Sequence, residues 1–168
     1  MDALMPSNTF SGSGKTREAA EGLLQLVTFK LDDEEFAINI LEVQEINRMT
    51  SITKMPNSPH HVEGVVNLRG RVIPVVSLRK KLGLAVKENN EHSRIMIMDI
   101  QGTTMGLIVD AVSEVLRIPS GIVEPPPPLS TDSGTEYIKG VAKLEDRLIM
   151  LVDLKGLFGM GDVSLIES

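Results

Sequence analysis

The side chains that most often perform enzyme chemistry are scarce in this chain of 168 residues. It has no Cys, which excludes disulfides, thiolate metal sites and a cysteine nucleophile. Its three His residues are His60, His61 and His92, and the adjacent pair is typical of a loop rather than of a metal site. Nothing supplies a nucleophile together with a base and an orienting group. The composition therefore predicts no catalytic centre, no metal site and no cofactor.

Two short runs look like ligand sites but lack necessary parts. Residues 11–16 read SGSGKT, as in a phosphate-binding loop, yet Thr9 stands where the first Gly of that motif belongs and no apolar strand precedes it. The acidic run Asp32–Glu35 lacks the spaced oxygen ligands and the Gly of a calcium loop. We interpret the first run as part of a disordered N-terminal tail and the second as a solvated hairpin tip.

The charge of −6 and the five aromatic residues argue against a nucleic-acid-binding protein. A small β-barrel that binds single strands is the alternative in another functional class. It requires a basic groove and aromatic side chains on which bases stack, and the sequence offers neither. No leader pattern and no apolar run near the roughly 20 residues of a membrane span occur. We expect a cytoplasmic protein without membrane insertion.

The apolar residues predict strands, because the chain holds 16 Val and 14 Ile. Val27, Phe29 and Leu31 alternate with polar residues before the acidic run, and Phe36–Ile40 alternates after it, which predicts a β-hairpin. Residues 41–48 and 110–117 fit a strand or a helix equally well. Pro125–Pro128 is interpreted as part of an extended surface loop.

An internal repeat divides the chain. Residues 61–78 match residues 137–154 at an offset of 76, and residues 27–48 match residues 96–117 at an offset of 69. Seven identical pairs support the first match, among them Gly64 with Gly140 and Arg71 with Arg147. The difference between the offsets falls in Pro-containing connections, where loops absorb insertions. The chain is therefore a duplication.

The duplication predicts an all-β fold of two packed five-stranded barrels of SH3 or OB type. Five short strands in about 70 residues suit a barrel, since closure removes exposed edges. Short helices are expected near residues 78–82 and 154–158, ended by Gly83 and Gly159. We expect one domain over residues 23–160, with repeats at about 24–84 and 93–160, between an N-terminal tail of residues 1–22 and a C-terminal tail of residues 161–168.

Three stretches of this sequence resemble the CheW family of chemotaxis coupling proteins. These are the run from Gly64 to Arg79 (GVVNLRGRVIPVVSLR), the run from Ile38 to Ile46 (INILEVQEI) and the run from Gly106 to Val115 (GLIVDAVSEV). They occur in order with natural spacing, and the resemblance extends from about Leu24 to about Phe158. It implies two barrels, with strands exchanged or permuted between them, around a shared core.

The resemblance also implies an adaptor rather than an enzyme. Members of the family link the cytoplasmic tips of chemoreceptors to the histidine kinase CheA, whose homologous domain pairs with them within receptor arrays. Receptor tips are expected in a hydrophobic groove between or beside the barrels. The resemblance places receptor or kinase contacts, which the sequence does not divide between the two partners, at Val43, Glu45, Gly64, Arg69, Gly70, Gly106 and Val115.

The repeat offers a separate argument for Arg69. The second copy has Glu145 and Asp146 where the first has Arg69 and Gly70, so a turn in this fold does not need Arg–Gly. We infer that Arg69 does more than close a turn, although an exposed turn Arg remains the simpler alternative. An ion pair between Glu45 and Arg69 is as compatible with the sequence as a solvated Glu45.

The same comparison favours structural roles for other positions. Gly64 and Gly140 occupy one repeat position, which indicates a bulge or corner, and Glu45 shares its position with Glu114. Val43, Val112 and Val115 fit the core or a binding groove, and the core is favoured because Val is most often buried.

A second alternative is the coupling domain of a kinase- or receiver-fused relative, acting alone. This chain contains neither a receiver nor a kinase sequence. It would therefore act through its interfaces in that case too.

Overall fold

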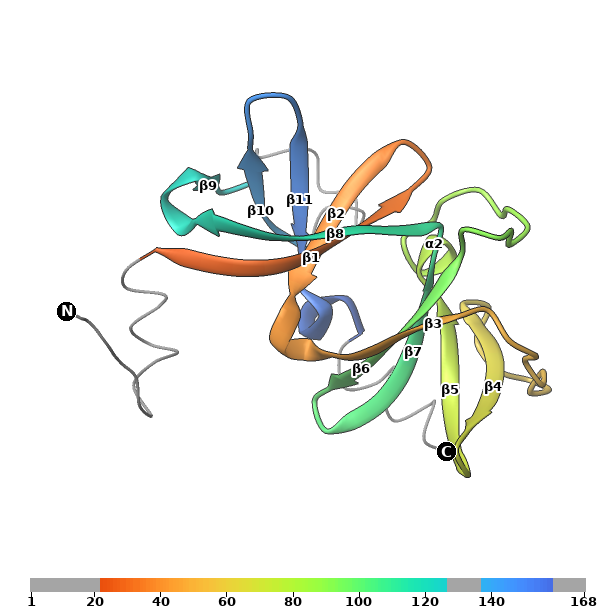
Figure 1. Cartoon of the computed structure of the whole chain (residues 1–168). Helices are drawn as coiled ribbons and strands as arrows, with labels where there is room; N and C mark the ends of the chain where they lie inside the picture. Colours follow the sequence, from red (N-terminus) through yellow and green to blue (C-terminus); the bar gives the residue numbers. More distant parts are fainter. Residues whose placement is uncertain (1–21, 127–136, 159–168) are drawn as a thin grey trace.

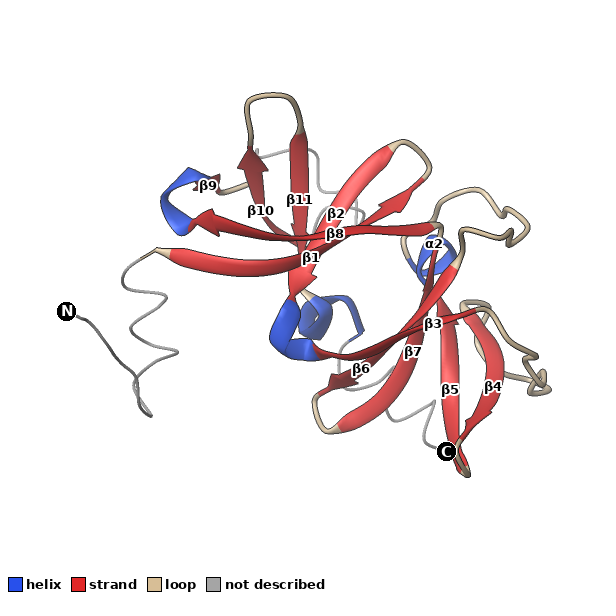
Figure 2. Ribbon diagram, viewed as in Figure 1, coloured by secondary structure: helices blue, strands red, loops and turns tan. Residues whose placement is uncertain are grey.

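The computed structural model describes residues 22–126 and 137–158. The predicted N-terminal and C-terminal tails, the SGSGKT run and the end of the Pro-rich segment lie outside these residues, apart from Gly22. The regular secondary structure of the described residues is almost entirely β-strand, as Figure 2 shows, which confirms the all-β prediction. No helix in residues 22–126 and 137–158 is long and apolar enough to cross a membrane.

Two sheets make up the fold (Figure 1). The six-stranded sheet consists, in spatial order, of β8 (Ala111–Pro119), β1 (Leu23–Leu31), β2 (Glu34–Asn39), β11 (Leu148–Val152), β10 (Ile138–Lys143) and β9 (Val123–Glu124). The five-stranded sheet consists of β3 (Val43–Arg48), β6 (Arg94–Ile100), β7 (Thr103–Val109), β5 (Arg71–Ser77) and β4 (Val62–Leu68). The predicted hairpin is β1–β2. The ambiguous segments are mainly strand: residues 43–48 form β3 after two residues of a short helix, and residues 111–117 belong to β8.

Neither sheet closes into the barrel expected from the sequence. In the six-stranded sheet the short helix η2 (Ser120–Ile122) interrupts the chain between β8 and β9, so these strands stay at opposite edges. In the five-stranded sheet the edges are β3 and β4, and the segment after β3 reaches β4 only at an isolated bridge between Thr53 and Val65. Closure is incomplete because a helical turn and a loop stand where ladder pairing would continue.

Each sheet contains strands from both sequence repeats. The β1–β2 hairpin of the first repeat joins the second repeat's strands by a parallel pairing of β2 with β11. The β6–β7 hairpin of the second repeat joins the first repeat's strands by a parallel pairing of β7 with β5. The chain passes between the sheets after β2, through helix η1 (Ile40–Glu42), and after β7, through the single residue Asp110. These two crossovers occupy equivalent positions in the repeat.

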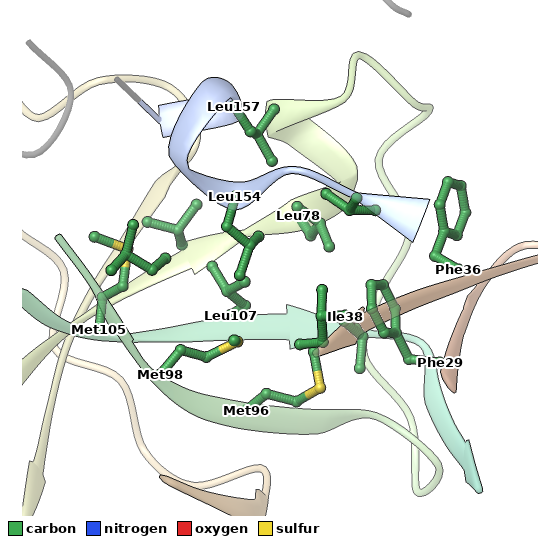
Figure 3. Packing of buried hydrophobic residues seen from close by; sticks show 14 of the residues in the cluster. Phe29, Phe36, Ile38, Leu78, Met96, Met98, Met105, Leu107, Leu154 and Leu157 are labelled. Atoms are coloured by element: carbon green, nitrogen blue, oxygen red, sulfur yellow. The ribbon is translucent and has the colours of Figure 1, made fainter. Parts of the chain in front are cut away.

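Three clusters of buried side chains form the core. One small cluster lies within each sheet, around Ala142 and Ile149 in the six-stranded sheet and around Ile95 and Ile97 in the five-stranded sheet. The largest cluster takes side chains from both sheets and includes Phe29, Met96, Met98, Met105 and Leu107, as Figure 3 shows. The sheets are therefore held together by apolar burial, the dominant favourable term in folding.

Both predicted short helices are present. Helix α2 (Leu78–Lys81) begins at Ser77, whose side chain accepts a hydrogen bond from the backbone N–H of Lys80. It ends before Gly83, which has a φ of +78° and donates its N–H to the carbonyl of Lys80. Residues 154–158 are helical as well, and Leu154 and Leu157 pack into the shared core beside Leu78 (Figure 3).

Candidate functional site

The turn between β4 and β5 has two central residues, Arg69 and Gly70, both with positive φ, at +52° and +85°. This is the backbone of a type I′ hairpin turn, for which Asn-Gly is the preferred sequence. The side chain of Asn67 accepts a hydrogen bond from the Gly70 N–H at 2.9 Å. Gly70 is explained by the backbone, whereas an Arg at the first position is unfavourable for the turn itself.

The equivalent turn between β10 and β11 differs in its backbone. Neither Glu145 nor Asp146 has a positive φ, and Leu144 donates its N–H to the Arg147 carbonyl at 2.9 Å. The expectation that this turn does not need Gly was therefore wrong. The two turns have different conformations, and only the first requires Gly. The inference that Arg69 does more than close the turn still holds, since no feature of the turn requires Arg.

The side chain of Arg69 is 72% exposed and forms an ion pair with Glu45, which is 31% exposed. The second carboxylate oxygen of Glu45 accepts a hydrogen bond from Asn47 at 3.2 Å. Glu45 lies on β3 and Arg69 follows β4, so the pair joins the two edge strands of the five-stranded sheet. The ion pair considered from the sequence is thus present. An exposed pair of this kind stabilises a fold by about 0–1 kcal/mol at most.

A related arrangement occurs at the equivalent place in the six-stranded sheet. Glu114, the counterpart of Glu45, forms an ion pair with Arg147. The Nε of Arg147 also lies 3.4 Å from a carboxylate oxygen of Glu35. The hydrogen bond to Glu114 raises the pKa of Arg147, against the opposing effect of partial burial. Arg147 is the counterpart of Arg71 rather than of Arg69, and Arg71 instead donates to Thr104 at 3.2 Å. Each sheet thus pairs its repeated Glu with an Arg, but with a different one.

Exposed apolar residues lie within three positions along the chain of the members of both ion pairs. Ile46 and Val115 occupy one repeat position, Val72 and Leu148 occupy another, and all four side chains are exposed. We call Glu45, Ile46, Arg69 and Val72 the Arg69 site, and Glu114, Val115, Arg147 and Leu148 the Arg147 site. Exposed apolar side chains grouped around charged ones are typical of protein interfaces.

The two sites differ in shape and charge. Arg69 projects from a hairpin tip, the exposed Arg71 follows two residues later, and the exposed Arg48 ends β3, the strand of Glu45. Arg147 lines a cleft of about 500 Å³, together with Glu35, Glu114, Asp33 of the β1–β2 turn and Glu34 at the start of β2. The chain therefore presents a basic projection on one sheet and an acidic cleft on the other.

Two of the predicted contact glycines are buried. Gly64 has a φ of +146°, lies at a register shift of β4, and a Cβ there would stand 2.1 Å from the backbone oxygen of Thr53. A Cβ on Gly106 would meet the Ile95 side chain at 2.7 Å. Gly140 lies at a similar register shift in β10, so the predicted bulge at this repeat position is confirmed. The structure accounts for Gly64 and Gly106 through close packing.

The valines do not behave alike. Val43 and Val112 are half-buried and pack against the shared core, in agreement with the sequence-based expectation. Val115 is 56% exposed, so its expected place in the core was wrong. On β8 it is paired with Val27, whose side chain lies in the shared core, but Val115 itself is at the sheet edge and nothing covers it among the described residues. Of the seven predicted residues, the structure brings Glu45, Arg69 and Gly70 together.

Sequence reasoning missed Ile46, Val72, Leu148 and the ion-pairing role of Arg147. A signal for Ile46 exists in the alternation of β3, where Val43, Glu45 and Asn47 are half-buried and the residues between them are exposed. This places a charged residue on the more buried face and an Ile on the exposed one. Such a departure from the usual pattern is expected at functional sites.

The turn geometry yields a test of what Arg69 does for folding. Replacing Arg69 with Asn should leave the free energy of unfolding unchanged or raise it by up to about 1 kcal/mol, because Asn tolerates positive φ better and the lost ion pair is exposed. Urea unfolding of the two proteins measures the difference. A loss of more than about 1 kcal/mol would show that Arg69 is needed for the fold.

Comparison with known proteins gives a consistent result. Residues 25–161 match the family described as "CheW-like domain". A probable chemotaxis protein CheW from Rhizobium etli is 36% identical over 138 residues, which cover 82% of this chain and 89% of that protein. The chemotaxis protein CheW of Rhizobium meliloti is 35% identical over 142 residues, covering 84% and 92% of the two chains.

A solved structure extends the agreement to three dimensions. The crystal structure of the scaffolding protein TtCheW from Thermoanaerobacter tengcongensis is similar with a TM-score of 0.75 and 40% sequence identity. The similarity covers 83% of this chain and 94% of that one. The family resemblance seen in the sequence is confirmed by matches that span both sheets, and this chain belongs to the CheW-like family.

Proposed function

We propose that this protein is a chemotaxis adaptor that couples the cytoplasmic tips of chemoreceptors to a CheA-type histidine kinase. It works through protein interfaces, without catalysis and without a cofactor. The names of its relatives support a role in chemotaxis, and the similar crystal structure is that of a scaffolding protein. The protein would act in the cytoplasm and reach membrane-bound receptor arrays through its partners.

The Arg69 site is the observation that carries this proposal. An Arg occupies a left-handed turn position that favours Asn, its side chain is mostly exposed and it is held by Glu45. The exposed Ile46 and Val72 lie close to the pair in the sequence. The guanidinium group can form two parallel hydrogen bonds and can stack, and Arg is enriched among the residues that dominate binding energy. A strained, ion-paired and exposed Arg is better explained by an interface than by folding.

An adaptor needs two binding regions, and the duplication offers two candidates. The Arg69 site and the Arg147 site lie on different sheets and differ in charge and shape. They can therefore bind different partners without competing, as the linking of receptors to a kinase requires. Each contact can be weak, because a repeated array raises the effective concentration of every partner.

Binding measurements with both partners test the proposal. The partners are the regulatory domain of the CheA-type kinase and a cytoplasmic receptor fragment, each from the organism that supplies this protein. Isothermal titration calorimetry should detect binding to each one. Size-exclusion chromatography should then show all three proteins in one complex. Failure to bind both partners would contradict the proposal, and binding of only one would contradict the coupling role.

A further inference from the structure

Arg79 is a charged residue in the buried part of the described chain, with 8% of its side chain exposed. It belongs to helix α2, directly after β5 of the five-stranded sheet. Its guanidinium group reaches away from that sheet toward two carboxylates. Figure 1 shows α2 close to the place where the chain crosses from one sheet to the other.

The contacts of Arg79 bring both sheets together. Its Nη1 donates to a carboxylate oxygen of Asp32, in the β1–β2 turn of the six-stranded sheet, at 2.7 Å. It also donates to a carboxylate oxygen of Asp110, the crossover residue between β7 and β8, at 2.8 Å. Its Nε donates to the carbonyl of Ala85 at 2.9 Å. The backbone N–H of Asp32 donates to the Asp110 carboxylate at 2.7 Å, which closes the group. We call Arg79, Asp32 and Asp110 the clasp.

The charges in the clasp are well compensated. Burial alone would lower the pKa of Arg79, but the hydrogen bonds and charges of Asp32 and Asp110 outweigh it, so the pKa is raised. Lys87 adds a positive charge 3.9 Å from the Asp110 carboxylate. Charged hydrogen bonds of this type are shorter and stronger than neutral ones, so they restrain the relative positions of the groups they join.

The repeat shows that this corner of the fold does not need a clasp. At the other crossover the positions of Asp32, Asp110 and Arg79 are occupied by Gln101, Leu41 and Lys155. That corner carries η1 in place of Asp110, and the chain folds there without two carboxylates around an Arg. The clasp therefore occurs at one of the two crossovers and is not required to form the repeated fold.

Part of the apolar core between the sheets can repack if their angle changes. Met96, Met98 and Met105 lie in the shared core with no exposed surface, and Met side chains adapt easily to altered packing. We infer that the clasp sets the angle between the two sheets, making the Asp110 crossover a rigid joint. The clasp thereby sets the relative placement of the Arg69 and Arg147 sites. The inference concerns the isolated molecule and does not depend on the proposed function.

Distances between spin labels test the inference, and the absence of Cys makes labelling simple. Arg48→Cys on β3 and Lys143→Cys on β10 place one label on each sheet, and both residues are exposed. Double electron–electron resonance should give a narrow distance distribution for this pair. Adding Arg79→Met should broaden the distribution or shift its mean. A second pair, Arg117→Cys with Lys143→Cys, lies within the six-stranded sheet and should not change.

The neighbouring residue supplies a matched control. Lys80, on the same helix, forms an ion pair at 2.7 Å with Glu63 of β4, within the five-stranded sheet. Lys80→Met removes an ion pair without touching the other sheet, so the distribution between the sheets should stay narrow. If Arg79→Met does not fold, Asp32→Asn replaces it, because Asp32 is half-exposed and Asn suits its φ of +58°. An unchanged distribution in the folded clasp variants would overturn the inference, as would equal broadening by Lys80→Met.

Discussion

Replacing Arg69 with Glu should weaken binding of the kinase regulatory domain, of the receptor fragment, or of both, by about 2 kcal/mol or about thirtyfold in Kd. The introduced carboxylate would face Glu45, so the substitution removes the guanidinium group and adds repulsion at the same place. The fold should remain intact because the side chain is exposed. Calorimetric titration measures the loss of binding, and urea unfolding checks the fold.

The β6–β7 turn provides the matched control for this substitution. Gln101 and Gly102 have φ values of +53° and +85°, close to those of Arg69 and Gly70, and Asp99 accepts the Gly102 N–H as Asn67 accepts that of Gly70. Gln101→Glu therefore adds a carboxylate to the same kind of turn and should leave binding unchanged. If folded Arg69→Glu protein bound both partners with normal affinity, the assignment of Arg69 to an interface would be wrong.

Replacing Gly64 with Ala should lower the free energy of unfolding by about 3 kcal/mol. The new Cβ would stand 2.1 Å from the backbone oxygen of Thr53 and 2.8 Å from its carbonyl carbon, and backbone atoms cannot move aside as a side chain can. The substitution would also break the bridge between Thr53, in the loop after β3, and Val65 of the edge strand β4. Urea unfolding of the two proteins measures the effect.

Two other glycines calibrate this result. Gly70→Ala should cost only about 1 kcal/mol, because its φ of +85° is unfavourable but no atom lies within 4 Å of the new Cβ. Gly140→Ala should have an intermediate effect, because its Cβ would meet a Val123 methyl group that can shift. A Gly64→Ala protein as stable as Gly70→Ala would show that the close approach of Thr53 does not limit the fold.

The sequence predicted the strands, both short helices and the duplication, because alternating apolar residues and the repeat are local signals. It did not show which halves of the repeats pair with one another. That choice depends on the parallel joints of β2 with β11 and β5 with β7, which connect residues far apart in the chain. Complete barrel closure was expected and is absent because η2 and the loop after β3 interrupt the ladders.

Within the candidate site, the sequence identified residues with distinctive chemistry. It did not predict which residues are buried and which are exposed. Arg69 was singled out by its type, and its pairing with Glu45 is present. The core position favoured for Val115 was wrong, because its edge strand leaves it exposed. Nothing in the sequence indicated that Ile95 packs against Gly106. Arg79 gave no signal, because it stands in a run of basic residues and its partners come from distant turns.

Kinase control in a reconstituted mixture tests the central claim, the adaptor function, most directly. Receptor-containing membranes and the CheA-type kinase are combined with and without this protein, and the rate of kinase autophosphorylation from ATP is measured as receptor ligand is added. We predict that the ligand changes the rate only when the protein is present, and that Arg69→Glu reduces this response. Equal control of the kinase by receptors in the absence of the protein would contradict the account.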